Sequence, residues 1–214
     1  MYRKYFKRLL DILFSIILLI LLSPLMSIVS VLIILFMGWP IIFMQDRPGL
    51  NEKPFKILKF RSMAIASNNQ SELTSDSSRI TALGTILRMT SIDELPELIN
   101  ILKGDMSFVG PRPLLTSYIP YYTEAERIRH KVRPGLTGLA QINGRNYLKW
   151  DERLKLDQEY VNCISFKLDF RIIARTIINT LKMSGIEPLT SETEGNLAEL
   201  RKNKQNTKSA ELKQ

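Results

Sequence analysis

The sequence predicts an α+β protein that is mostly helical. We expect an N-terminal re-entrant membrane helix, followed by a compact cytosolic domain with interfacial amphipathic helices and a small β-hairpin. Three observations support this fold class. Residues 12–40 are uncharged and mostly apolar, later apolar residues recur at helical spacing between segments punctuated by glycine and proline, and the formal net charge is +9. The expected divisions are a membrane hairpin at 1–40, a catalytic domain at 41–188 and a polar tail at 189–214 that is disordered or loosely helical.

The bulk composition limits the class of function. The basic excess, with a pI of about 9.7, indicates an anionic partner such as nucleic acid, phospholipid headgroups or a phosphorylated substrate. Cys163 is the only cysteine, so the sequence excludes an intrachain disulfide and a cysteine-rich zinc site. We expect Cys163 to be a small buried side chain. We expect His130, the only histidine, to be a surface or structural residue rather than a catalytic base.

The run at 12–40 is long enough to enter a bilayer. Its length exceeds the roughly 20 residues that a helix needs to cross, and it is too long for the core of a cleaved signal peptide, which is about 7–15 residues. Basic residues flank the run on both sides, which favours a cytoplasmic location for both flanks. Ser23 and Pro24 lie near its middle, and a proline removes a helical hydrogen bond. The residues alone leave two topologies open: a helix that bends there and returns, or a transmembrane helix with a mild kink.

Short elements follow the membrane segment. Pro48-Gly49 predicts a turn that leads into a short strand or strand pair within 45–63, and residues 64–79 are expected to form a polar loop. A helix is expected from Leu95, because apolar residues recur there at i, i+3, i+4 and i+7. Gly104 is placed to end that helix as a C-terminal cap.

A second turn and two further helices complete the domain. The stretch "RPGLTGLAQINGRN" predicts a loop and a hairpin with Asn143-Gly144 at its turn. The stretches "DERLKLDQEYV" and "DFRIIARTIINTLKM" predict helices. The second carries one apolar stripe, formed by Phe170, Ile173, Ile177 and Leu181. Such a basic amphipathic helix can lie on an anionic bilayer or pack its stripe against the core, and we favour the core.

The stretch "SIDELPELIN", residues 91–100, has two interpretations. Asp93 can cap a helix with Glu94 in its first turn, or Ser91 and Glu94 can form a capping box, and local rules favour such a structural role. The alternative is chemistry. Two adjacent carboxylates among phosphates can hold Mg²⁺, and an ionised carboxylate can be the nucleophile of phosphoryl transfer. The cations expected to gather phosphate oxygens around them are Lys59, Arg61, Arg88, Arg112 and Arg145.

Several long motifs occur together: "KFRSM", "SIDELPELINILKGDMSFVGPRPL", "RPGLTGLAQINGRN" and "LD…LDF". In this order they resemble the bacterial sugar transferases, the small monotopic, PglC-like phosphoglycosyl transferases, over the chain up to about residue 185. The resemblance implies transfer of a sugar 1-phosphate from a UDP-sugar to undecaprenyl phosphate with release of UMP, the first membrane step of glycan assembly. It implies that Asp93 carries the phosphosugar covalently, and that Glu94 places Mg²⁺ or the acceptor phosphate. It also favours the re-entrant topology, with the helix broken at Ser23-Pro24.

The resemblance extends to further candidate residues. Lys59, Arg88, Arg112, Arg145, Asp157 and Asp169 match positions expected to bind substrate. Two of these also have structural interpretations: Asp169 as the cap of a helix that begins at Phe170, and Asp157 as a surface acid on its helix. The implied location is the cytoplasmic face of the bacterial inner membrane, with a homodimer as one assembly state and no nucleic acid bound. The rival functions are a membrane-tethered basic module that binds lipid or nucleic acid without catalysis, and a polytopic sugar-phosphate transferase, which needs several membrane spans.

Overall fold

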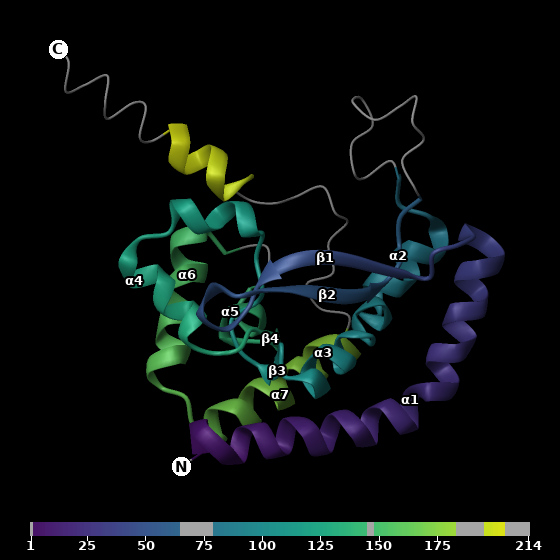
Figure 1. Ribbon diagram of the computed structural model, residues 1–214, viewed down its shortest axis with the longest axis horizontal. Helices are drawn as coiled ribbons and strands as arrows, with labels where there is room; N and C mark the ends of the chain where they lie inside the picture. Colours follow the sequence, from purple (N-terminus) through teal and green to yellow (C-terminus); the bar gives the residue numbers. More distant parts are fainter. Residues whose placement is uncertain (1, 65–78, 145–147, 183–194, 204–214) are drawn as a thin grey trace.

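The computed structural model describes residues 2–64, 79–144, 148–182 and 195–203, and it is mostly helical with two small strand pairs (Figure 1). The helices are α1 (Lys7–Met37), α2 (Ala82–Met89), α3 (Glu97–Lys103), α4 (Glu124–Arg127), α5 (Leu139–Ile142), α6 (Trp150–Asn162) and α7 (Phe166–Leu181). The strands are β1 (Ile42–Pro48), β2 (Pro54–Phe60), β3 (Ser107–Val109) and β4 (Gly135–Thr137). The predicted long apolar helix, small hairpin and helical majority are confirmed.

Helix α1 is long, apolar and bent. It has 31 residues and is the one helix among the described residues that is long and apolar enough to cross a membrane. Figure 1 shows two legs joined by a bend, and Pro24 lies inside the helix. Pro24 has no N–H, so the Ile20 carbonyl, four residues earlier, receives no helical hydrogen bond from it. The Ser23 hydroxyl donates to this carbonyl instead, at 2.8 Å. Apolar side chains on both legs, such as Leu21 and Leu35, are exposed.

The first leg of α1 is fastened to the interior of the domain. Arg8 donates to the Ile101 carbonyl at 2.6 Å, in the last part of α3, where the helix dipole favours a cation. Asp11 is buried and accepts hydrogen bonds from the Ser107 hydroxyl and the Phe108 N–H, both at 3.1 Å. These contacts fix the position of α1 relative to α3 and β3.

The end of the second leg is fastened by β2 and its continuation. The buried Arg61 guanidinium donates to the carbonyls of Met37, Gly38 and Trp39, which are left without helical partners where α1 ends. Its positive charge also complements the C-terminal end of the helix dipole. Both legs of α1 are therefore held by the elements that carry the site.

The β1–β2 hairpin confirms the strand pair predicted within 45–63. The strands are antiparallel, in a register that runs from Ile42 opposite Phe60 to Pro48 opposite Pro54. Helix α3 docks on this hairpin through Asn100, whose side chain is buried, accepts from Leu58 N at 3.0 Å and donates to Lys56 O at 2.8 Å. The Asn100 side chain thus bonds to the edge of β2 that does not pair with β1, and it sets the distance between α3 and the strand that carries Lys59.

The second strand pair corrects the prediction of a hairpin with Asn143-Gly144 at its turn. Strand β4 pairs in parallel with the distant β3, and residues 139–142 form α5 instead of a returning strand. The backbones of Gly135 and Gly110 approach each other closely, because a Cβ on Gly135 would lie 2.1 Å from the Gly110 N atom. Pairing with β3, which is remote in sequence, gives the backbone N–H and C=O groups of β4 their hydrogen-bond partners. The turn propensity of Asn143-Gly144 therefore does not decide the structure here.

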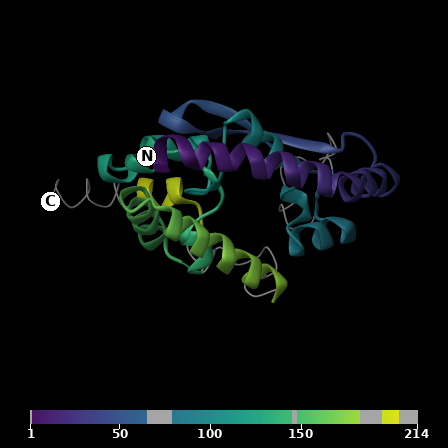
Figure 2. The same cartoon turned by 90° about the horizontal axis from the view of Figure 1, so that it is seen from below.

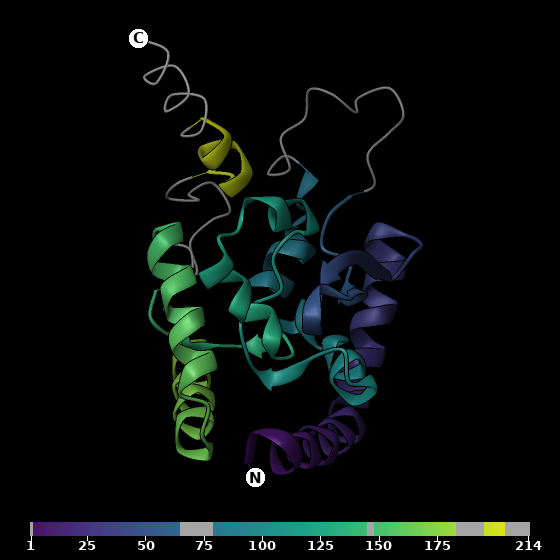
Figure 3. The ribbon, with the colours of Figure 1, turned by 60° about the vertical axis from the view of Figure 1, so that its left-hand side comes forward.

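Helices α6 and α7 form one side of the molecule, and α1 with the hairpin forms the other (Figure 3). The apolar stripe of α7 is exposed, with 65% of Phe170 and 54% of Ile177 accessible, so the expectation that it packs against the core is wrong. The core-facing side of α7 is the one that carries Ile172 and Asp169, both buried. Figure 2 shows α7 and α1 from below, where they meet near the N-terminus. Cys163, expected to be buried, is exposed just after α6.

Residues 197–203, within the expected tail, form a short helix (Figure 1). Leu197 is 1% exposed and packs in a cluster with Trp150 and Leu154. Arg201 forms a bidentate ion pair with Glu126, with both N···O distances 2.6 Å. An apolar contact and a fork-shaped ion pair together provide the tertiary partners that a short polar helix needs. The other residues of the expected tail, and most of the expected loop at 64–79, lie outside the described residues.

We predict that Leu197→Ala destabilises the domain, because it empties a fully buried leucine site, which costs about 2–3 kcal/mol. Chemical denaturation in detergent measures the change. Glu199→Ala, an exposed position of the same helix, is the control and should change stability by less than about 0.5 kcal/mol. Equal effects of the two substitutions would show that this helix does not depend on docking.

Candidate active site

The Asp93-Glu94 pair lies in a turn between α2 and α3, which corrects the capping prediction. Residues Ile92–Glu94 form a single 3₁₀ turn, and α3 begins only at Glu97, after Pro96. Ser91 has a left-handed backbone (φ 57°) and makes no capping hydrogen bond, so neither Asp93 nor a capping box starts the helix. Only seven residues separate the end of α2 from the start of α3, and the 3₁₀ turn lies within them. The turn points Asp93 into a cavity instead of along a helix axis.

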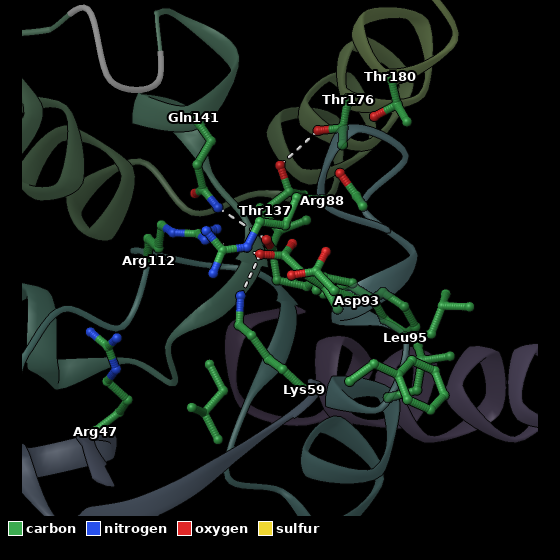
Figure 4. A pocket seen from close by; sticks show the side chains of 18 of the residues that line it. Arg47, Lys59, Arg88, Asp93, Leu95, Arg112, Thr137, Gln141, Thr176 and Thr180 are labelled. Atoms are coloured by element: carbon green, nitrogen blue, oxygen red, sulfur yellow. Dashed lines mark hydrogen bonds and ion pairs between the residues drawn. The ribbon is translucent and has the colours of Figure 1, made fainter. Parts of the chain in front are cut away.

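That cavity has a volume of about 1900 Å³ and is bordered by α1, β2, α2, α7 and the segment after β3. Figure 4 shows Lys59, Arg88, Asp93 and Arg112 around the same space. Apolar side chains of α1 and α7, such as Phe14 and Ile173, line another part of it. One end is therefore charged, and the other can accommodate an apolar group.

Glu94 is held by two cations. Its Oε1 accepts from Lys59 Nζ at 2.6 Å and from Arg112 Nη2 at 2.9 Å, and Lys59 Nζ is also 3.2 Å from Glu97 Oε1 (Figure 4). Pro111 and Pro113 flank Arg112 and stiffen the backbone from which it reaches the site. The structure thus brings together Lys59, Arg112 and Glu94, as the sequence predicts.

Glu97 is a member of this group that the sequence reasoning missed. It is 3% exposed, and its carboxylate faces the ammonium group of Lys59. The available signal was its place in the same motif, one position after Pro96 and four after Asp93, which puts a third acid near the pair. A charged residue on the buried side of an otherwise apolar helix is rarely there without a partner.

Electrostatics separate the three carboxylates. Burial, reinforced by the charge of Glu94, raises the pKa of Asp93 to about 6. Burial also acts to raise the pKa of Glu94, but Arg112 and Lys59 overcome it and lower that pKa to about 2. Burial and the Glu94 charge raise the pKa of Glu97 to about 7. Near neutral pH, Glu94 is the permanent anion of the ion pairs, and Asp93 is ionised but more basic than an ordinary aspartate.

Asp93 is also the carboxylate without a committed partner. It is 8% exposed and forms no hydrogen bond or ion pair with another described residue. Arg88, at the end of α2, has a favourable electrostatic interaction with it and donates through Nε to the Ser62 hydroxyl at 2.8 Å. An ionised carboxylate that faces a cavity, near cations but bonded to none of them, is available to react with a ligand.

Asp157 is not the surface acid that the sequence allowed. It is buried and pairs with Arg129, at N···O distances of 2.8 and 3.1 Å. Arg129 in turn donates to the Arg112 carbonyl at 2.7 Å. Although Asp157 borders the cavity, its described contacts fix the backbone beneath Arg112, so it acts on the site through that arginine.

Asp169 fastens the start of the chain to α6 and α7. Its carboxylate accepts from the Tyr2 hydroxyl and Lys7 Nζ, both at 2.6 Å, and from the Tyr160 hydroxyl at 2.8 Å. The proposed cap at Phe170 is wrong, because α7 begins at Phe166 and is capped by the Ser165 hydroxyl. Asp169 therefore sets where the first leg of α1 meets the domain.

His130 and Arg145 are the two remaining residues that the sequence singles out. His130 is buried, and its Nδ1 lies 3.3 Å from Glu52 Oε1 at the hairpin turn, which confirms a structural role. Burial and the neighbouring Arg129 lower the pKa of His130 to about 4, so it is neutral at physiological pH. Arg145 lies outside the described residues.

The site thus combines a carboxylate that bonds to no described residue, several cations near it, and a cavity with a charged end and an apolar end. The chain belongs to the bacterial sugar transferase family, whose model matches residues 2–183. It is thus a phosphoglycosyl transferase by family, which confirms the resemblance drawn from the motifs.

Individual relatives support this assignment. The chain is 46% identical over 181 residues to the uncharacterized sugar transferase EpsL of Bacillus subtilis (strain 168), covering 85% of this chain and 90% of the relative. It is 41% identical over 182 residues to the UDP-glucose:undecaprenyl-phosphate glucose-1-phosphate transferase of Klebsiella pneumoniae, covering 80% and 39%. It is 39% identical over 185 residues to the UDP-N-acetylgalactosamine-undecaprenyl-phosphate N-acetylgalactosaminephosphotransferase of Aeromonas hydrophila, covering 81% and 43%. The chain thus spans about two fifths of the length of the last two relatives.

We predict that Asp93→Asn stabilises the fold at neutral pH. The raised pKa means that the folded chain keeps this proton at pH values where an unfolded aspartate has lost it, so stability falls as pH rises towards and through about 6. Removing the charge should recover on the order of 1–2 kcal/mol at about pH 7.5. Thermal unfolding in detergent should show a gain for the variant that shrinks as the pH approaches 4. A constant gain, or a loss, would contradict the raised pKa.

Proposed function

We propose that this protein transfers a sugar 1-phosphate from a UDP-sugar to undecaprenyl phosphate, releasing UMP and forming an undecaprenyl-diphosphate sugar. The observation that carries the proposal is Asp93, an unpaired and relatively basic carboxylate at the charged end of the cavity. Family membership supports the reaction class. The names of the Klebsiella and Aeromonas relatives support the acceptor, and the differing sugars in those names leave the sugar to be determined by assay.

In the first step, an oxygen of the Asp93 carboxylate attacks the phosphorus that bears the sugar. The bond between that phosphorus and the bridging oxygen breaks, and the bridging oxygen leaves with the electron pair as part of UMP. In the second step, an oxygen of the acceptor phosphate attacks the same phosphorus. The bond to Asp93 then breaks, which restores the carboxylate. Atoms and charge balance without a further reactant.

The neighbouring residues have distinct proposed roles. Glu94 keeps Lys59 and Arg112 in place, and the two cations face the phosphate oxygens that gain charge during transfer. Because both cations are bonded to Glu94, Asp93 does not form a stable ion pair with either of them and stays reactive. Arg88 supplies a further positive charge near Asp93.

Mg²⁺ is part of the proposal, and the donor set fits it. Among the described residues, no cluster of three or more acidic, histidine or cysteine side chains is arranged to hold a metal. Mg²⁺, however, is commonly bound by one or two carboxylates plus substrate phosphate oxygens. Both cations meet Oε1 of Glu94, which leaves its other oxygen and the Asp93 carboxylate as ligands. The bound ion would offset the charge of the diphosphate.

The bent helix α1 suggests how a soluble donor and a lipid acceptor reach one site. We propose that its two legs enter and leave the cytoplasmic leaflet of the inner membrane on the same side, with the exposed stripe of α7 at the interface. The acceptor phosphate at headgroup level then lies at the plane of Asp93. The rival function, a basic tethered module that binds without catalysis, has no use for an unpaired carboxylate at the centre of its basic site.

We predict that the wild-type chain, with polyprenyl phosphate, Mg²⁺ and a panel of UDP-sugars in nanodiscs, releases UMP, and that Asp93→Asn lowers this rate by roughly 10³-fold or more, because it removes the nucleophile. The variant should also lose the phosphosugar adduct that mass spectrometry detects on the wild-type chain after incubation with the donor alone. The kcat/KM of the wild-type chain should fall below about pH 6, as Asp93 becomes protonated. Substantial turnover by Asp93→Asn would refute the covalent route, and no release with any sugar would refute the reaction.

We predict that both flanks of α1 are cytoplasmic. In a Cys163→Ser background, Lys4→Cys and Lys53→Cys should react with a membrane-impermeant maleimide only after the inner membrane is permeabilised. Labelling of either flank from the periplasm, while an exposed α7 position such as Arg171→Cys stays protected, would instead identify a spanning helix.

A further inference from the structure

Arg47 is a cation of the cavity that the proposed reaction has not used. It lies near the end of β1 and lines the cavity (Figure 4). Its described hydrogen bonds go to neutral groups, the Gln45 side-chain oxygen at 2.6 Å and the Pro113 carbonyl at 3.3 Å. Its buried Nε has no hydrogen-bond partner. The guanidinium therefore has no carboxylate bonded to it and has donors left over.

This charge is costly in the absence of an anion. Lys59 and Arg112 are compensated by Glu94 and Glu97, whereas Arg47 has no ion pair with a described residue. Burial and repulsion by Arg112 both lower the pKa of Arg47. A partly buried cation beside another cation is stabilised most by a ligand that brings negative charge. The guanidinium geometry suits a phosphate group.

The position of Arg47 indicates which of the two proposed substrates its guanidinium is placed to bind. Strand β1 begins close to the end of α1 and runs away from it, so Arg47 lies about 16 Å further along the strand, at a rise of about 3.3 Å per residue. Arg88, by contrast, lies near the end of α2, directly after Leu87, which packs in one cluster with Val29 and Ile33 of the second leg of α1. Arg47 also bonds to the backbone that follows Arg112, so the two guanidinium groups share one rigid support.

We infer that Arg47 binds the phosphate of the donor that leaves as UMP, whereas the acceptor phosphate approaches from the α1 and Arg88 side. The inference rests on the proposed function and assigns a nucleotide-phosphate subsite to the far end of the hairpin. Arg47 and Arg112 then hold the two sides of the bond that breaks.

UMP affinity tests the inference directly. Calorimetry on the detergent-solubilised chain should show that Arg47→Gln raises the dissociation constant for UMP at least about tenfold, the usual scale for one charge-assisted hydrogen bond. Uridine, which has no phosphate, should bind the variant and the wild-type chain equally. Arg47→Lys should lose less affinity than Arg47→Gln, and it keeps the charge if the glutamine variant does not fold. Arg171→Gln, at an exposed position of α7 that does not line the cavity, is the matched control and should bind UMP like the wild-type chain.

Kinetics provide the second measurement. The KM for polyprenyl phosphate should be unchanged in Arg47→Gln, while the KM for the UDP-sugar rises. Unchanged UMP affinity in the variant, an equal loss for uridine, or a raised KM for the acceptor alone would overturn the assignment. Failure of the wild-type chain to release UMP from any UDP-sugar, despite binding it, would refute the proposed function and leave the Arg47 binding result to stand separately.

Discussion

The ion pairs of Glu94 with Lys59 and Arg112 are the interaction on which the rest of the site depends. Two cations and a carboxylate bonded at 2.6 and 2.9 Å form a stable local unit, and their mutual satisfaction leaves Asp93 without a bonded partner. Had either cation bonded Asp93 instead, the pKa of that aspartate would fall and its reactivity with it. The pair of neighbouring acids therefore works by division of roles, in which one acid holds the cations and the other stays free.

Much of the fold serves to hold these three side chains. Lys59 is on a strand that Asn100 connects to α3, and Arg112 is on a stiff segment whose carbonyl is held by the buried Arg129–Asp157 pair. The same domain grips α1 near its start and at its end, through Arg8 and Arg61. The proposed reaction between a soluble donor and a lipid acceptor would require this connection, because it places the proposed nucleophile Asp93 at a fixed depth relative to the apolar helix.

The cavity has more positive charge than its carboxylates neutralise. Glu94 and Glu97 compensate Lys59 and Arg112, while Arg47 and Arg88 form no ion pair with a described residue. In the proposed reaction, two phosphorylated substrates meet at one nucleophile. The separation of Arg47, at the far end of the hairpin, from Arg88, near the end of α2, would give each substrate its own cation, and part of the basic excess of the sequence would then serve substrate binding.

The sequence by itself determined the long apolar helix, its proline bend, the first hairpin, the end of α3 at Gly104 and the motif that carries Asp93 and Glu94. These features rest on composition, periodicity and turn chemistry, which act over a few residues. The tertiary structure decided the rest, because it depended on partners distant in the chain. Pairing of β4 with β3 replaced the expected hairpin, docking on Trp150 ordered residues 197–203, and Arg129 made Asp157 a buried partner instead of a surface acid. The division of roles between Asp93 and Glu94 is of the same kind, since no local rule states which of two adjacent acids the distant cations will bind.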